Sequence, residues 1–328
     1  MSQPRQAPRS SRFVVVGAGA IGMLYAARLA AAGLETELWA RSRAQAAQLD
    51  ARGIELIDRE GSREIAIPAR AATDAPGAPA DVVLLTVKQP DIDDALISTV
   101  MRAGRPGALL LCLQNGIGHM PGLRAAMPGW RAAAVVTTDG ALRLGGRAVR
   151  HTGTGRLWIE DTDGLECPIR IREGDMTQKM LVRQLKNAGI DAVLSKKMKD
   201  RIYQKLLLNA VINPLTALYG VKNGRLPDDP ARALLMRRLH EEAFLVLHTD
   251  GMSGGEEAWA RLHEVCRATA DNESSMLQDI RRGRRTEVDW INGGIVALAR
   301  QYGLAAPLHE AMVTLVRTLE GAADGPST

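Results

Sequence analysis

The stretch Val14–Gly22, VVVGAGAIG, decides the fold of the first half of this chain. It continues a run of four apolar residues, Phe13 to Val16, which is typical of a strand buried on both faces of a parallel sheet. Gly17 can turn the chain sharply, Gly19 lets a pyrophosphate approach the backbone, and Gly22 lets a following helix pack closely on the strand. The pattern predicts a dinucleotide-binding turn.

The sequence around the turn supports this prediction. A helical run, Met23 to Ala32, follows it, and a second strand, Glu35 to Trp39, comes next. The N-terminus of such a helix offers free N–H groups and the positive end of a dipole, so a pyrophosphate needs no charged side chain. The residues expected to contact the cofactor here are those of the turn itself: Gly17, Ala18, Gly19, Ala20, Ile21 and Gly22.

The end of the second strand favours NADP over NAD. NAD-binding units usually carry an acidic residue there, about 20 residues past the glycines. In this chain Glu35 and Glu37 lie inside the strand, and its tip carries Arg41, Ser42 and Arg43. We expect Arg41 to bind a 2′-phosphate, because a guanidinium donates two parallel charge-assisted hydrogen bonds. The alternative is that both arginines only begin a solvated helix.

Two further buried strands, Asp81 to Val87 and Ala108 to Leu113, end in polar residues. Ligands of open α/β sheets lie over the carboxyl ends of the strands, so Lys88 and Asn115 are expected near the cofactor. The alternatives are a surface lysine and an Asn-Gly turn. A helix is expected to begin at Pro90.

The rest of the first half is rich in strands. Ile54 to Ile57 and Glu64 to Ile67 predict a small antiparallel pair. The strands expected between Arg131 and Glu160 would extend or close one side of the sheet. A helix over Thr177–Asn187 and a last strand over Asp191–Leu194 complete the pattern, after which no strand recurs.

The length of 328 residues suggests about two domains. We expect residues 1–11 to be a disordered tail, because they lack the apolar core of a secretion signal. Residues 12–196 are predicted to form the α/β dinucleotide-binding domain. Residues 197–328 are predicted to form an all-helical domain that binds the substrate.

Composition excludes several functions. The net charge is +5, but the arginines are spread along the chain, which indicates attraction for small anions and not a nucleic-acid surface. Cys112, Cys167 and Cys266 match no metal-ligand spacing and indicate a reducing compartment. The longest apolar stretch is interrupted by glycines and Arg28, so no membrane span is expected. We predict a cytoplasmic protein without metal, nucleic-acid or membrane partner; monomer and homodimer both stay open.

One helix of the second half, Met198 to Tyr219, carries an unusual face. Lys205, Asn209 and Asn213 recur at every fourth position among apolar neighbours, so they project from one side. Pro214 follows and is expected to kink the helix. Burying such a polar stripe without partners is costly, so a ligand explains it better than packing does. Solvent exposure is the alternative.

Together these segments resemble the ketopantoate reductase family, 2-dehydropantoate 2-reductases. The resemblance rests on GAGAIG from Gly17, Lys88, LQNG around Asn115, QKLLLNAVINPLTALYG over 204–220, and SSMLQDIRRGRRTEVDWING over 274–293. It spans nearly the whole chain, and the last two motifs are the most specific. It implies a Rossmann-like first domain, an all-helical second domain, and reduction of ketopantoate to (R)-pantoate by NADPH, on the way to pantothenate and coenzyme A.

The resemblance also implies roles for individual residues. Lys205 matches the lysine that donates a proton to the substrate carbonyl, and Glu287 matches the carboxylate linked to that lysine. The implied substrate contacts are Asn209, Asn213, Ser275, Asn115 and, as a further candidate, Asn272. The implied cofactor contacts outside the glycine turn are Arg41 at the 2′-phosphate and, near the nicotinamide half, Lys88, Asn115 and Glu287.

The chemistry of the residues agrees with these roles. Hydride attack on a ketone builds negative charge on its oxygen, which a cation with an acidic proton neutralises. Burial lowers the pKa of a lysine while a neighbouring carboxylate raises it, and the sequence leaves open which effect is larger for Lys205.

Two other functions stay open. One is the reduction of a different branched 2-oxo acid, in which the pocket lining decides; Arg281, Arg282, Arg284 and Arg285 face either the solvent or the substrate. The other is a non-catalytic NADP-sensing protein, which the absence of Lys205 or Glu287 would have favoured.

Overall fold

The computed structural model describes residues 11–74, 77–162, 176–255 and 257–323. The expected tail, apart from Ser11, and Cys167 therefore lie outside the described residues. The chain forms two compact units. The first unit contains residues up to Gln114 and His119–Met198, and the second contains Asn115–Gly118 and everything from Lys199 onward.

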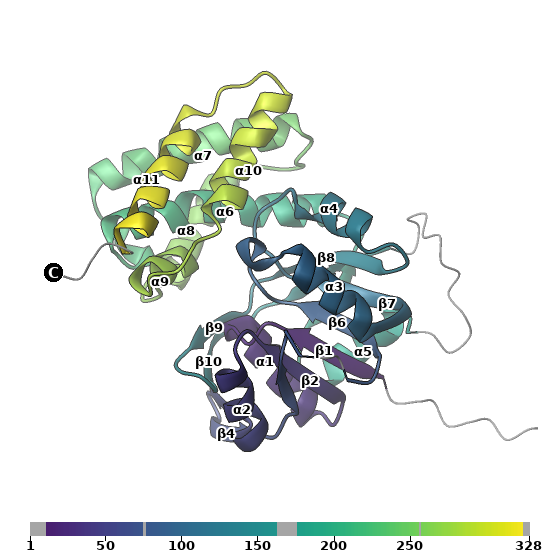
Figure 1. The fold of residues 1–328 in the computed structure, drawn as a ribbon. Coiled ribbons are helices and arrows are strands. Elements are labelled where there is room, and N and C mark those ends of the chain that lie inside the picture. The colour runs from purple at the N-terminus through teal and green to yellow at the C-terminus, as the bar shows by residue number, and fades with distance from the viewer. Residues whose placement is uncertain (1–10, 75–76, 163–175, 256, 324–328) are drawn as a thin grey trace, which may run out of the picture. The chain divides into compact units, whose positions relative to one another are not determined.

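The first unit is built on an eight-stranded sheet (Figure 1). Its strand order is β12-β11-β8-β7-β6-β1-β2-β5, and β11 against β8 is its antiparallel pair. The strands are β1 Arg12–Val16, β2 Glu35–Ala40, β5 Ala69–Ala71, β6 Ala80–Leu85, β7 Gly104–Cys112, β8 Arg131–Thr137, β11 Leu157–Glu160 and β12 Ala192–Ser195. Residues Phe13–Val16 at its centre are fully buried, as expected for a parallel strand covered on both faces.

The helices of the first unit follow the expected alternation with strands. They are α1 Ala20–Ala31, α2 Arg43–Arg52, α3 Asp94–Ala103, α4 His119–Ala126 and α5 Gln178–Asn187. The expectation that a helix begins at Pro90 is wrong. Residues Gln89–Asp91 form a short 3-10 turn, and α3 begins only at Asp94, because Asp93 caps it by accepting from the N–H of Leu96 at 2.7 Å.

A second, four-stranded sheet has the order β4-β3-β10-β9. Its strands are β3 Ile54–Asp58, β4 Gly61–Ile65, β9 Gly140–Arg143 and β10 Ala148–Gly153. The strands of 131–160 were expected to extend or close the main sheet, which is correct for β8 and β11 and wrong for β9 and β10. β10 instead pairs parallel with β3, and this buries Val149 and Leu56 in one core with α1.

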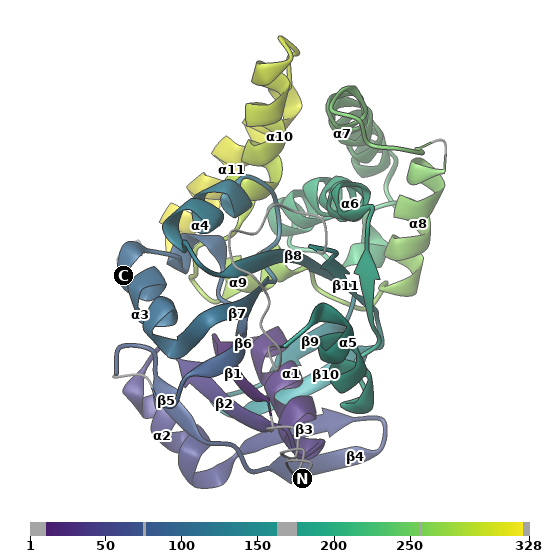
Figure 2. The same cartoon turned by 90° about the vertical axis from the view of Figure 1, so that its right-hand side faces the viewer.

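Helices alone form the described part of the second unit (Figure 2). They are α6 Met198–Tyr219, whose first residue belongs to the first unit, α7 Pro230–Thr249, α8 Ala258–Ala268, α9 Ser275–Arg281, α10 Val288–Gln301 and α11 Pro307–Ala323, with a 3-10 turn η2 over Asn223–Arg225. None of the helices in the described ranges is long and apolar enough to span a bilayer.

Helix α6 continues through Pro214, and a side chain from α10 supplies the hydrogen bond that the proline cannot make. Pro214 has no N–H to donate to the carbonyl oxygen of Ala210. The Nδ2 group of Asn292, which is fully buried, donates to that oxygen at 2.9 Å. Asn292 is also 2.9 Å from Nδ1 of His309, whose Nε2 lies 3.1 Å from the carbonyl oxygen of Leu239. A buried polar network thus joins α6, α7, α10 and α11.

Candidate active site

The turn after β1 has the geometry that its glycines predict. The N–H of Gly17 donates to the carbonyl oxygen of Trp39 at 2.9 Å, and the φ angle of Gly17 is +112°. A Cβ atom on Gly17 would lie 2.8 Å from Oγ1 of Thr86. That hydroxyl donates to the carbonyl oxygens of Val16 and Gly17, each at 2.9 Å. The turn is therefore fixed by the chain at the ends of two neighbouring strands, and Gly17 admits no side chain.

The other two glycines differ from each other. A Cβ atom on Gly22 would lie only 1.8 Å from the carbonyl oxygen of Gly17, so close packing of α1 requires glycine there. A Cβ atom on Gly19 would meet no described atom within 4 Å. Gly19 is the N-cap of α1 and brings no capping side chain to the first amide groups of the helix. This combination fits the pyrophosphate of a dinucleotide.

Arg41 and Arg43 at the tip of β2 differ in how firmly they are held. Arg43 lies in the first turn of α2 and donates through Nε and Nη2 to Asp74, at 3.1 and 3.0 Å. Arg41 precedes Ser42, the N-cap of α2. Its side chain is 87% exposed and makes one long contact, 3.5 Å, with Asp91. Exposed pairs of this kind are weak, so Arg41 can change partner at little cost.

Lys88 lies where the sequence predicts, just beyond the carboxyl end of β6. It is half-buried and follows Thr86 and Val87, the residues that surround Gly17.

In the second unit, Lys205 is a half-buried residue of α6. Burial lowers the pKa of its ammonium group to about 8, and the Glu287 carboxylate acts in the opposite direction. Burial is thus the larger of the two effects that the sequence left undecided. Among the described residues the ammonium group makes no hydrogen bond.

Glu287 is held in place from two sides. It is 6% exposed and occupies the N-cap position of α10, where the helix dipole favours a negative charge. Its Oε2 atom accepts a hydrogen bond from Nδ2 of Asn115 at 2.8 Å. The structure therefore brings together three predicted site residues, Lys205, Glu287 and Asn115.

Asn115 owes its position to the loop Asn115–Gly118, which packs on α10. The N–H of Ile117 donates to the carbonyl oxygen of Trp290 at 3.1 Å. Gly116 has a φ angle of +83°, and a Cβ atom on it would lie 2.3 Å from the same oxygen. Asn115 and Gly116 thus form the turn that was the alternative to a functional role, and this turn also positions the Asn115 side chain at Glu287.

The remaining substrate candidates have different surroundings. Asn209 is half-buried and Asn213 is 6% exposed, and neither side chain has a hydrogen-bond partner within the part of the chain that is described. Ser275 is exposed at the start of α9. Asn272 is exposed, and its carbonyl oxygen accepts from the N–H of Asn223 at 3.0 Å. Within the described ranges, neither Asn272 nor Ser275 hydrogen-bonds to Lys205.

Sequence reasoning missed residues that hold these parts in place. Thr86 could have been found as the lone hydroxyl in the apolar run DVVLLTV. Ser274, buried beside Ser275, caps α9 and accepts from Oγ1 of Thr216 in α6 at 2.6 Å. No local pattern indicates that pairing.

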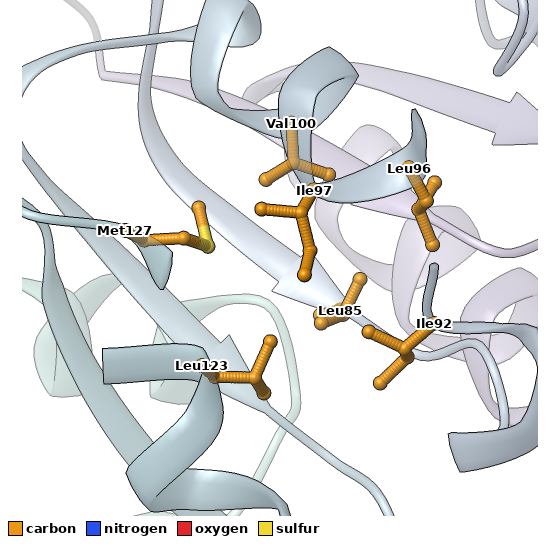
Figure 3. A pocket seen from close by; sticks show the side chains of 7 residues that line it. All are labelled: Leu85, Ile92, Leu96, Ile97, Val100, Leu123 and Met127. Atoms are coloured by element: carbon orange, nitrogen blue, oxygen red, sulfur yellow. The ribbon is translucent and has the colours of Figure 1, made fainter. Parts of the chain in front are cut away.

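A hollow between α3, α4 and the end of β6 does not serve as a ligand site (Figure 3). Its lining is wholly apolar: Leu85, Ile92, Leu96, Ile97, Val100, Leu123 and Met127. It is too tight to hold even a water molecule. It is ordinary packing of helices on the sheet.

Comparison with known proteins agrees with this geometry. Residues 13–164 match the model of ketopantoate reductase PanE/ApbA, and residues 197–320 match that of its C-terminal part. A 2-dehydropantoate 2-reductase of Bacillus subtilis is 32% identical over 306 residues, which cover 93% of this chain and 96% of the relative. The chain belongs to the ketopantoate reductase family.

Solved structures agree with that assignment. A PanE/ApbA family ketopantoate reductase from Ralstonia eutropha JMP134 is 28% identical and superposes with a TM-score of 0.84, covering 95% of this chain and all of the other. D-mandelate dehydrogenase, solved with NADH and anilino(oxo)acetate, shares the fold with a TM-score of 0.86 at 22% identity, over 96% of this chain and all of the other. This member of the ketopantoate reductase family is an oxidoreductase with a Rossmann-like unit and a helical unit.

Proposed function

We propose that this enzyme reduces 2-dehydropantoate to (R)-pantoate with NADPH, a step toward pantothenate and coenzyme A. The observation that carries the proposal is the group Lys205, Glu287 and Asn115, in which a half-buried ammonium lies near a carboxylate fixed by an amide. Relatives named 2-dehydropantoate 2-reductase over nearly the full chain support the choice of substrate.

Lys205 is proposed as the proton donor. NADPH, when bound, supplies a hydride to the carbonyl carbon of the substrate. The carbonyl oxygen then gains negative charge, which the ammonium group of Lys205 stabilises and neutralises by giving up a proton. A pKa of about 8 makes this lysine a stronger acid than an ordinary one, yet leaves it mainly protonated at pH 7.

Glu287 is proposed to keep that proton available. Its negative charge raises the pKa of Lys205 against the effect of burial. Asn115 donates to Oε2 and orients the carboxylate, and the start of α10 favours its negative charge.

The polar stripe of α6 is proposed to hold the substrate. The amide groups of Asn209 and Asn213 lack partners among the described residues, so both are available to hydrogen-bond a ligand. Ser275 and Asn272 are proposed as further contacts to the carboxylate or hydroxyl of the substrate. Substrate would thus bind in residues 197–328, to which the loop Asn115–Gly118 adds one side chain.

The cofactor is proposed to bind to residues 12–196. Gly17–Gly22 would hold the pyrophosphate, Arg41 the 2′-phosphate, and Lys88 the nicotinamide half, with Asn115 and Glu287 as further contacts. A protein of this kind is expected in the cytoplasm, as a monomer or homodimer.

A steady-state assay tests substrate, cofactor and activity together. The purified enzyme is expected to consume NADPH, seen as loss of absorbance at the nicotinamide band, only after ketopantoate is added. NADH should give a much lower kcat/KM, because it has no 2′-phosphate for Arg41. Tight NADPH binding without turnover would indicate a cofactor-sensing protein and overturn the proposal.

The second candidate is a reductase for another branched 2-oxo acid. The shared fold of D-mandelate dehydrogenase shows that this architecture is compatible with a different substrate. A panel of 2-oxo acids separates the two: the proposal requires the highest kcat/KM for ketopantoate.

A further inference from the structure

The glycine turn is held by two side chains outside it. The carbonyl oxygen of Ala18 accepts a hydrogen bond from Nε2 of Gln45 at 3.0 Å and a longer one from Nη1 of Arg143 at 3.4 Å. Gln45 belongs to α2, and Arg143 is the last residue of β9. Two elements distant in sequence thus fix one peptide group of the turn.

Gln45 is itself firmly placed. Its Nε2 group also donates to the carbonyl oxygen of Gly146 at 2.8 Å, and its backbone N–H donates to Oγ of Ser42 at 3.2 Å. Arg143 donates through Nε to the carbonyl oxygen of Gly145 at 2.8 Å. The turn between β9 and β10 therefore supports both donors.

The orientation of this peptide group matters for binding. In a trans peptide the carbonyl and the following N–H point in opposite directions. When Gln45 and Arg143 hold the Ala18 carbonyl, the N–H of Gly19 must point away from them. Gly19 is also the residue whose Cβ position borders open space, where a ligand can approach the backbone.

We propose that Gln45, assisted by Arg143, is a positioning residue for the cofactor pyrophosphate. By holding the Ala18 carbonyl it presets the Gly19 N–H, so that the turn need not reorient when a dinucleotide binds. The inference rests on the proposed function only in that a dinucleotide binds to this turn. Gln45 is not expected to contribute to recognition of the 2′-phosphate, which is the role proposed for Arg41.

The test measures binding without any substrate. Gln45→Leu removes the donor and keeps the side-chain volume; Gln48→Leu, an exposed position on the same helix, is the control. Dissociation constants are measured by calorimetry for NADPH, NADH and 2′-AMP, which carries the 2′-phosphate but no pyrophosphate. Thermal unfolding of each variant is recorded in parallel.

Gln45→Leu is expected to weaken NADPH and NADH alike, about tenfold, and to leave 2′-AMP binding unchanged. Arg143→Met should act in the same direction more weakly, with Arg143→Lys restoring part of the affinity. Gln48→Leu should bind all three ligands as the wild type does. Arg41→Ala is expected to show the opposite pattern, weakening NADPH and 2′-AMP but not NADH.

Two results would overturn the inference: unchanged dinucleotide affinity in Gln45→Leu, or an equal loss for 2′-AMP together with a lower melting temperature. The second result would mean that Gln45 only stabilises the fold. A wild-type protein that binds neither NADPH nor NADH would instead refute the proposed function, so the two failures are distinguishable.

Discussion

The glycine turn of the first unit and the polar stripe of α6 differ in whether the chain itself supplies partners for their polar groups. In the turn, the backbone groups are held by Thr86, Trp39 and Gln45, and Gly17 and Gly22 are required by close packing. On α6, Asn209 and Asn213 have no partner among the described residues. A region completed by its own chain is rigid before a ligand arrives, whereas a region with unpaired groups depends on the ligand to complete it.

The first prediction tests the reactive end of the stripe and has the largest effect. Lys205→Ala is expected to lower kcat by about a hundred- to ten-thousandfold, because the developing oxyanion loses its proton donor. The affinity for NADPH should stay unchanged, since the turn is untouched. Lys222→Ala, which removes an exposed ion pair with Asp271, is the control. Normal turnover by Lys205→Ala would remove the lysine from the mechanism.

The second prediction tests whether the turn is rigid. Gly22→Ala places a Cβ atom 1.8 Å from the carbonyl oxygen of Gly17, so the melting temperature should fall and dinucleotide binding should be lost. Gly19→Ala meets no described atom within 4 Å and should keep its melting temperature. Its added methyl group nevertheless occupies the approach to the backbone, so NADPH affinity should fall about tenfold or more. Equal melting temperatures for both variants would contradict this account.

The third prediction concerns the scaffold of the stripe. Asn292→Ala is expected to lower the free energy of unfolding by about 2 kcal/mol, because the carbonyl oxygen of Ala210 and the His309 ring both lose a buried partner. Gln301→Ala, at an exposed amide of the same helix, should change it little.

A double-mutant cycle sharpens this result. Pro214→Ala restores an N–H that can donate to the Ala210 carbonyl. The gain in the free energy of unfolding from Pro214→Ala should therefore be larger by about 1 kcal/mol in the Asn292→Ala background than in the wild type. Simple additivity, measured by denaturant unfolding, would show that Asn292 does not act through that carbonyl.

The fourth prediction, the smallest in size, is a change in pH dependence. With a pKa of about 8, Lys205 loses its proton as the pH rises above that value, and kcat should fall along this limb. Glu287→Gln removes the charge that raises this pKa, so the limb should move to lower pH by about one unit. If the high-pH limb of kcat does not move in Glu287→Gln, the Glu287 charge does not influence the pKa of Lys205.

Local patterns were sufficient where the decisive interactions are local. The start of α7 follows from the Asp229 cap and Pro230 at its first position, and the glycine turn follows from spacing alone. The sequence could not assign β10 to the small sheet, because its parallel pairing with β3 joins residues nearly a hundred positions apart. The β5 strand of three residues is also too short to give a pattern.

The site shows the same division. Lys205, Asn209 and Asn213 share a helical face, which their spacing of four residues predicts from the sequence. The residues that support the two sites carry no such pattern. Asn292, which donates to Ala210 in α6, is recognisable only once Pro214 is seen to leave that carbonyl without a donor. Gln45, which donates to Ala18 in the glycine turn, is recognisable only once Ala18 is seen to lie beside α2. Residues that hold a site in place are chosen by tertiary contacts and carry no spacing of their own.

The loop Asn115–Gly118 makes the second unit discontinuous along the gene. A fragment beginning at Lys199 would lack the amide that restrains Glu287 and would leave the Trp290 carbonyl without its Ile117 donor. The helical half therefore cannot be exchanged between relatives as a single cassette. A chimera must carry these four residues from the same parent, or recombination would uncouple the carboxylate from its support.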